Sequence, residues 1–296
     1  NWCWHCVRNR ADVNAHFDAP AEPANALPTI SLDYYFMGAE DEDTIPMLAI
    51  KDRRQKLLWS TPLEAKGANS HAVNELAHAV REAGYRRLTF KSDQEASIIT
   101  LKHACKAALV DVEFLMQENP VDDHKANGDI EVGIREIKKV IRVMKSTLEA
   151  KLKRKIAPSD PLIAWMPRHA AFLMSRYKVG EDGRTPNERR TGKRWRRPLV
   201  QYGERILFRP VRRKGKKNDL EAKLTEGHYI GTNSRTSELM VMTTSGIMRG
   251  TSFNRLGPQE RWSTPDYEEL RGLPWRWRPE ARELLPQPMP VPAPAG

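Results

Sequence analysis

Residues 120–145 read PVDDHKANGDIEVGIREIKKVIRVMK, and this is the most informative stretch of the chain. Turn-forming residues open it, and from Gly128 onward apolar residues recur at spacings of three and four, which predicts a helix. The apolar stripe of that helix consists of Ile130, Ile134, Ile137 and Ile141. Glu131 lies one residue away from the stripe in the first turn, where the helix dipole favours an acid. Such an acid is typical of a solvated surface helix, but it also looks out over the edge of any sheet beneath the stripe.

Two strand-like segments carry further acids. Residues 29–37, TISLDYYFM, are apolar, β-branched or aromatic on both sides of Asp33, and residues 88–93, LTFKSD, end on Asp93. A carboxylate in a buried strand destabilises the fold unless its charge is compensated, and a metal ion is the usual compensation. With Glu131, these acids supply the oxygen ligands for two Mg²⁺ ions about 3.5–4 Å apart, the arrangement that catalyses in-line phosphoryl displacement.

The order Asp33, Asp93, Glu131, with 59 and 37 residues between them, resembles the acidic triad of retroviral and retrotransposon integrases. The segment NGDIEVGIREIKK around Glu131 is similar to the family's Asn-Gly-x-x-Glu followed by a basic amphipathic helix, and SDQEASI resembles the segment of its second aspartate. The resemblance covers roughly residues 27–155. It implies that Asp33 bridges two Mg²⁺ (or Mn²⁺) ions, and that Asp93 and Glu131 each complete the coordination of one.

Composition and charge indicate about two domains and a polyanionic partner. The chain is 296 residues long, 40% apolar and carries a net charge of +11, but residues 135–217 alone hold 26 Lys and Arg against 7 Asp and Glu. That balance of +19 leaves −8 for the rest of the chain, and so basic a region is expected to bind nucleic acid. No apolar run suggests a membrane span and no signal-like segment begins the chain, so we expect an intracellular protein; the resemblance implies the nucleus or an element particle.

Two basic segments are expected to hold DNA phosphates. The first follows Glu131 by about two to three helical turns and contains Lys138, Lys139 and Arg142. The second is the connector at residues 179–198, whose GRTPNERRTG resembles the copia-type connection after the integrase core. Its phosphate contacts would come from Arg189, Arg190, Lys193, Arg194, Arg196 and Arg197. Trp195 would offer an aromatic plane to an exposed base.

The remaining pattern predicts an α/β core over residues 27–178. We expect strands at residues 29–37, 47–51, 56–61, 88–91 and 112–116, and helices at residues 70–84, 94–109, from 128 and at 162–177 with a proline interruption. Strands that come first as a meander and then alternate with helices indicate a mixed sheet flanked by helices. The resemblance implies that this is the five-stranded ribonuclease H-like sheet. His71 and His78, on one face of the first helix, are expected to be surface or boundary residues.

The amino-acid pattern changes after the connector. Residues 199–257 contain short β-rich runs separated by Gly, Asn, Ser and Lys clusters, which predicts a small antiparallel β-barrel of about five strands. GERI, GHYIG and TTSG there resemble recurring segments of the barrel-like region of copia-type polyproteins. In this region Lys214, Lys216 and Lys217 could contact DNA or form a solvated loop. The tail at residues 258–296, rich in Trp, Arg and Pro, is expected to be disordered.

The first 26 residues are interpreted as the remnant of a zinc module followed by a linker. Cys3 and Cys6 have the spacing of half a tetrahedral Zn²⁺ site, and His5 between them is badly placed to join. Integrases of this kind carry an N-terminal His-His-Cys-Cys module, so the resemblance implies that Zn²⁺ binds only if that module is complete. Three cysteines are too few for a disulfide framework, and Cys105 is expected in the core.

The resemblance implies a metal-dependent polynucleotidyl transferase that cuts and joins element ends and target DNA, acting as a homo-oligomer. One ion would activate water or a DNA 3′-hydroxyl, and the other would stabilise the leaving oxygen. Asp122 or His124, in the loop with Asp123 before Glu131, could assist, although such residues ordinarily form turns. The alternative is a catalytically inactive, domesticated DNA-binding protein. A ribonuclease H-like nuclease that cuts without joining is a further rival, which the basic barrel disfavours.

Overall fold

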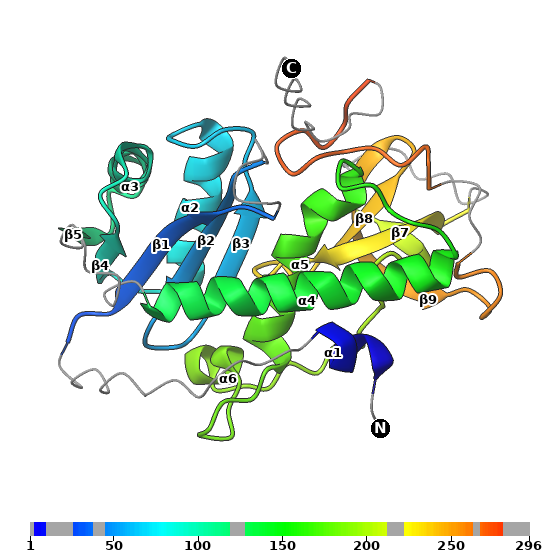
Figure 1. Ribbon diagram of the computed structural model, residues 1–296, viewed down its shortest axis with the longest axis horizontal. Coiled ribbons are helices and arrows are strands. Elements are labelled where there is room, and N and C mark those ends of the chain that lie inside the picture. Colours follow the sequence, from blue (N-terminus) through cyan, green and yellow to red (C-terminus); the bar gives the residue numbers. More distant parts are fainter. Residues whose placement is uncertain are drawn as a thin grey trace, which may run out of the picture.

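The computed structural model describes residues 3–9, 26–37, 45–118, 128–211, 222–262 and 267–280. Its first unit is a five-stranded sheet of order β3-β2-β1-β4-β5, shown on the left of Figure 1. The strands are β1 (Thr29–Tyr35), β2 (Met47–Asp52), β3 (Leu58–Pro62), β4 (Arg87–Ser92) and β5 (Glu113–Glu118). β2 is antiparallel to β1 and β3, whereas β4 is parallel to β1 and β5.

Helices cover both faces of this sheet. On one face, α2 (Ser70–Ala83) and α3 (Ala96–Ala108) pack on the even-numbered residues of β1, such as Ile30 and Leu32. On the other face, α4 (Gly128–Leu152) and α5 (Pro161–Tyr177) pack on Tyr35 and Ala49. The sheet with its helices has the ribonuclease H-like topology, so the predicted fold class is confirmed.

α4 forms where the sequence predicts it, and its stripe is buried. Ile130, Ile134, Ile137 and Ile141 all belong to the core beneath the helix. With 25 residues, α4 is about 37 Å long, and it extends beyond the sheet that it covers. Figure 1 shows that it runs on toward the second unit, where the Leu148 side chain lies against the backbone of Gly203.

The second unit is a closed barrel of β6 (Arg205–Pro210), β7 (Thr225–Thr232), β8 (Leu239–Thr243) and β9 (Gly246–Arg255). It has four strands, where about five were expected. The ten-residue β9 pairs with β8 through residues 246–250 and with β6 through residues 250–255, so one bent strand closes the barrel. A register shift near Phe208 and Pro210 accommodates the bend.

α5 joins the two units. Asp160 caps its N-terminus by accepting a hydrogen bond from the Leu162 backbone N–H at 2.9 Å, and the helix continues without interruption through Pro167. Most of its residues are buried, because α5 packs against β3 on one side and β7 on the other. Sheet, α5 and barrel therefore share one hydrophobic core, which includes Ile230 and Met240 of the barrel.

The prediction of a disordered tail is wrong for residues 267–280. Tyr267 is 0% exposed, and Leu270 and Leu273 are buried in the shared core. The Trp165 indole N–H donates to the Gly272 carbonyl at 2.9 Å, which ties the tail to α5. Large aromatic side chains bury enough area here to order a segment whose charged and Pro-rich composition suggests otherwise. Residues 263–266 and 281–296 of the predicted tail lie outside the described residues.

Two short helices complete the described chain. α1 (Trp4–Asn9) lies against α4, and the His5 ring hydrogen-bonds the Ser146 hydroxyl at 2.7 Å. α6 (Pro186–Thr191) begins with a capping box in which Thr185 and Glu188 satisfy each other's backbone N–H groups. No helix in the described ranges is long and apolar enough to cross a bilayer.

Candidate active site and nucleic-acid interface

Asp33 lies on the α4 face of the sheet. Its antiparallel partner on β2 is Ala49, and side chains alternate along β1 so that Asp33 shares a face with Tyr35, which packs under α4. β1 also pairs with β4 in parallel, with Ser31 opposite Lys91. Continuing that register by two residues brings Asp33 level with Asp93, so the carboxyl ends of two neighbouring strands carry the two predicted aspartates.

The charges of the other predicted acids act on Asp33. Its pKa is raised from 3.8 to about 7, first because burial disfavours the charged form and next because Asp93 is close. Glu131 and Glu95 raise the pKa further, while a hydrogen bond from the Tyr34 backbone lowers it. The charges of acids at the end of β4 and the start of α4 therefore act on Asp33 of β1, although they are far apart in the sequence.

Asp93 and Glu131 differ in their surroundings. Asp93 follows β4 directly, is partly buried and accepts a hydrogen bond from the Glu95 backbone N–H at 3.4 Å. Glu131 stands exposed in the first turn of α4. Within the described residues, no three Asp, Glu, His or Cys side chains are positioned to hold one metal ion. The donor set itself fits Mg²⁺, because all three side chains offer carboxylate oxygens.

Two charged residues near the triad were missed by sequence reasoning. Glu95 is held by Lys66, whose Nζ lies 2.7 Å from Glu95 Oε1. Lys102 of α3 is completely buried and donates to the Gln117 carbonyl at 3.3 Å. Burial lowers the pKa of Lys102, while the charges of Glu118 and Asp93 raise it. The available signal for Lys102 was its place on the apolar stripe of α3.

The basic residues of α4 lie on the Glu131 side of the helix. At about 100° per residue, Lys138 and Arg142 come round to the same face as Glu131, and Lys139 is adjacent. Arg142 is exposed, whereas Lys138 and Lys139 are partly buried. The Lys138 Nζ lies 5.7 Å from the centre of the Tyr35 ring, so its ammonium group lies near the end of β1. Cations and the third acid thus share one accessible helix face.

Some of the predicted DNA contacts in the connector are bonded within the protein or partly buried, and others are exposed. Arg189 binds Asp182 through Nε at 2.9 Å, and the Arg197 guanidinium donates to the Ser237 carbonyl at 2.6 Å. Arg190 is partly buried, and burial lowers its pKa. Lys193, Arg194 and Arg196 of the same segment are exposed, and so is Arg197 despite its hydrogen bond to Ser237.

Trp195 does not present an open ring. It is partly buried and meets Phe172 edge-on, with ring centroids 5.6 Å apart. The guanidinium carbons of Arg176 and Arg197 lie 5.4 and 5.8 Å from its centre. These contacts give Trp195 a structural role in place of the expected one in base stacking.

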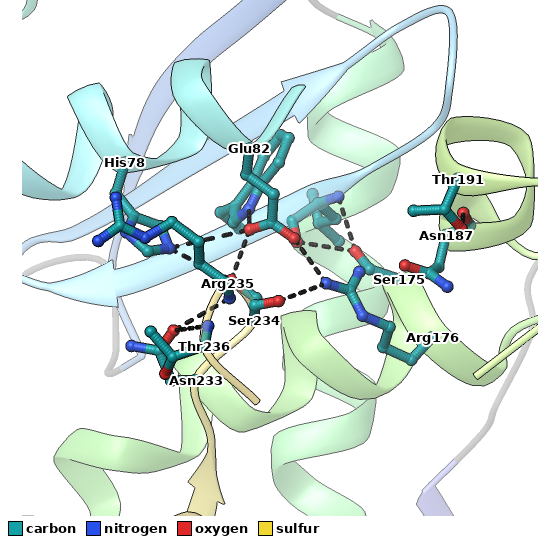
Figure 2. Close-up of polar contacts among 12 residues, drawn as sticks. His78, Glu82, Ser175, Arg176, Asn187, Thr191, Asn233, Ser234, Arg235 and Thr236 are labelled. Carbon is teal, nitrogen blue, oxygen red and sulfur yellow. Dashed lines mark hydrogen bonds and ion pairs between the residues drawn. The ribbon is translucent and has the colours of Figure 1, made fainter. Parts of the chain in front are cut away.

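A buried polar cluster joins the sheet unit to the barrel (Figure 2). Glu82 of α2 and Arg176 of α5 are 5% and 2% exposed and form an ion pair of 2.6 Å. Glu82 also accepts from the Trp59 indole N–H at 2.7 Å and from the Ser234 hydroxyl at 2.5 Å. His78 lies 3.3 Å from that hydroxyl. Because Ser234 follows β7, the cluster fixes the barrel to α2, β3 and α5.

His71 and His78 are both partly buried, as expected for boundary residues. In the N-terminal segment Cys3 is exposed, and the Cys6 side chain lies outside the described residues, so the zinc expectation stays a prediction. Asp122, Asp123 and His124 lie outside them too, as does the group Lys214, Lys216 and Lys217. Cys105 is buried as predicted.

Comparison with known proteins gives matches among solved structures alone. No family model and no curated protein matches the chain. The catalytic core domain of BIV integrase is 11% identical, covering 55% of this chain and 93% of that one at a TM-score of 0.36. The HTLV-2 integrase catalytic core domain in complex with magnesium is 10% identical, covering 55% and 95% at 0.40. A simian T-cell lymphotropic virus intasome in complex with PP2A regulatory subunit B56 gamma is 11% identical, covering 86% and 88% at 0.44. Likeness at this level adds nothing about site or chemistry.

Proposed function

We propose that this chain is the catalytic part of a copia-type retrotransposon integrase, a polynucleotidyl transferase that cuts and joins DNA ends. The observation that carries the proposal is the strand register that brings Asp33 of β1 level with Asp93 after β4. The pKa of Asp33, which burial and the charges of Asp93 and Glu131 raise to about 7, agrees with that placement. Carboxylates forced together in this way are expensive unless a cation neutralises them, and such pKa shifts gather at functional sites. The order and sequence context of the three acids support the same assignment.

Asp33, Asp93 and Glu131 would hold two Mg²⁺ or Mn²⁺ ions. Bound there, the ions would lower the pKa of an attacking water or 3′-hydroxyl and stabilise the leaving oxygen of the phosphodiester. Asp33 would be the central ligand of this group, because the charges of both other acids act on it. Glu131 is exposed, and the proposal requires its carboxylate to turn toward the aspartates by rotation about its side-chain bonds.

DNA would lie along the basic face of α4 and across the connector. Arg142 and the exposed group Lys193, Arg194 and Arg196 are suited to contact phosphates, since they are accessible and positively charged. Lys138 and Lys139 would support the duplex near the acids. Two DNA ends and a target duplex call for more than one copy of such a surface, so we expect a homo-oligomer working in the nucleus or an element particle.

A strand-transfer assay with Mn²⁺ tests the proposal, using a labelled duplex with 3′-hydroxyl ends and a supercoiled plasmid as target. The wild-type protein should join the labelled strand to the plasmid, and Asp33→Asn should abolish joining. Glu113→Gln, which alters an exposed acid of β5, is the matched control and should leave joining intact. Joining that survives Asp33→Asn would overturn the catalytic assignment.

One observation favours the inactive, DNA-binding alternative: within the described residues no three acidic, His or Cys side chains are arranged to share a metal ion. That alternative predicts DNA binding that Asp33→Asn leaves unchanged, together with no joining in Mn²⁺ by the wild-type protein. A free nuclease would instead cut the duplex in Mn²⁺ without producing joined plasmid.

A further inference from the structure

A buried lysine reaches from the sheet to the first turn of α4. Lys51 of β2 is 9% exposed, and its Nζ lies 2.7 Å from the Asp129 carbonyl oxygen and 2.9 Å from Asp129 Oδ1. Asp129 is two residues before Glu131. A second lysine, Lys56, is more exposed and lies farther away, with its Nζ 3.9 Å from the same Asp129 oxygen. Lys51 is therefore the main cationic partner of Asp129 at the start of α4.

Lys51 belongs to the face of the sheet that carries Asp33. In the β1–β2 ladder Lys51 is opposite Ser31, and Asp33 is opposite Ala49. Lys51 and Asp33 are therefore diagonal neighbours, with Cα atoms about 7–8 Å apart. Even so, the Lys51 ammonium bonds Asp129, and the charges that act most on Asp33 are those of other acids. The lysine is thus directed at the helix rather than at the candidate metal ligand.

The aliphatic part of the Lys51 side chain also packs against the next turn of α4. A Cβ added to Gly133 would lie 3.3 Å from Lys51 Cδ and 3.2 Å from Leu58 Cδ1, so the helix backbone rests directly on these two side chains. Asp129 and Gly133 are one helical turn apart, on either side of Glu131. Contacts at both positions fix the height and the rotation of the turn from which Glu131 projects.

Electrostatics alone does not account for this arrangement. A cation at a helix N-terminus opposes the helix dipole, and burying a lysine is costly, so the Asp129 carboxylate has to offset both. A buried apolar residue on β2 would fill the same space without these costs. The ammonium, however, can bond a carbonyl and a carboxylate together, which gives the helix start a defined orientation.

We propose that Lys51 is a positioning residue, which anchors the first turn of α4 to β2 and so holds Glu131 toward Asp33 and Asp93. The inference rests on the proposed function, since it concerns how the third carboxylate reaches the metal site. Asp129 is the partner through which Lys51 acts, and neither residue touches the reacting atoms.

Mn²⁺ affinity measured by isothermal titration calorimetry on the full chain tests this inference. Lys51→Met should weaken Mn²⁺ binding about 10- to 100-fold, the usual effect of losing a residue that orients a metal ligand. A purely electrostatic lysine predicts the opposite sign, because removing a nearby cation strengthens cation binding. Lys56→Met is the matched control: it removes the more exposed lysine beside Asp129 and should not weaken Mn²⁺ binding.

A double-mutant cycle makes the inference specific to Glu131. If Lys51 acts through Glu131, Lys51→Met with Glu131→Gln should bind Mn²⁺ no more weakly than Glu131→Gln alone. Lys51→Leu, which also removes the ammonium group, should weaken binding in the same direction and serves if Lys51→Met does not fold. Tight binding by Lys51→Met, or by Lys51→Leu in its place, overturns the inference when Glu131→Gln binds weakly. Absence of binding by the wild type overturns the proposed function itself.

Discussion

Replacing Asp33 with asparagine should stabilise the metal-free protein, and increasingly so as the pH rises. The folded protein raises the pKa of Asp33 from 3.8 to about 7, so folding favours the protonated acid. Stability from this group is fully present below pH 3.8 and is lost as the pH rises through about 7. This rise in the pKa of Asp33 corresponds to a destabilisation of the folded protein by about 4 kcal/mol at high pH. Because Asp33 keeps some contact with water, we expect Asp33→Asn to raise the free energy of unfolding by about 2 to 4 kcal/mol.

Urea unfolding in EDTA at pH 5 and pH 8 measures this effect. Asp33→Asn should unfold at a higher urea concentration than the wild type at pH 8, and the difference should be much smaller at pH 5. Asp111→Asn, which changes an exposed acid, should show no such pH dependence. A difference between Asp33→Asn and wild type that is the same at both pH values would refute the idea that Asp33 is buried among repelling carboxylates.

Three further predictions concern the junction, the tail and the basic surface. Arg176→Met should lower the free energy of unfolding by about 3–5 kcal/mol, because it leaves Glu82 buried without its cation, and adding Glu82→Leu should recover most of the loss in urea unfolding. Tyr267→Ala should cost about 3–5 kcal/mol by the same measurement if the tail is part of the core, whereas a disordered tail predicts no change. Neutralising the exposed connector cations should weaken DNA binding and lower its salt dependence, measured by fluorescence anisotropy, by about one unit of logarithmic slope for each phosphate that the protein no longer neutralises. An unchanged slope would remove these cations from the interface. The substitutions for that test are Lys193→Ala, Arg194→Ala and Arg196→Ala.

Local patterns predicted the core because they are strong there. The isoleucine stripe of α4 and the five strands around Asp33 follow from periodicity and β-branched runs, and the structure confirms them. The proximity of Asp33 and Asp93 could be predicted only from the family resemblance. It depends on the order of the strands in the sheet, which the spacing of residues along the sequence does not determine.

Features that depend on contacts between distant segments could not be predicted. Tyr267 is buried because it packs into the core that α5 shares with the Gly203 turn, with its hydroxyl 2.5 Å from the Gly203 carbonyl. Arg190 and Trp195 belong to a segment that composition marks as a DNA contact, yet neighbouring helices bury them in part. Lys51 looks like an ordinary strand residue until α4 is placed over it.

Anomalous diffraction from crystals grown with Mn²⁺ would show whether the three acids share a metal site. We predict Mn²⁺ peaks between Asp33 and Asp93, with the Glu131 carboxylate among the ligands. Strong diffraction with no anomalous peak at these carboxylates, or a peak bound by other residues alone, would contradict the proposed metal site.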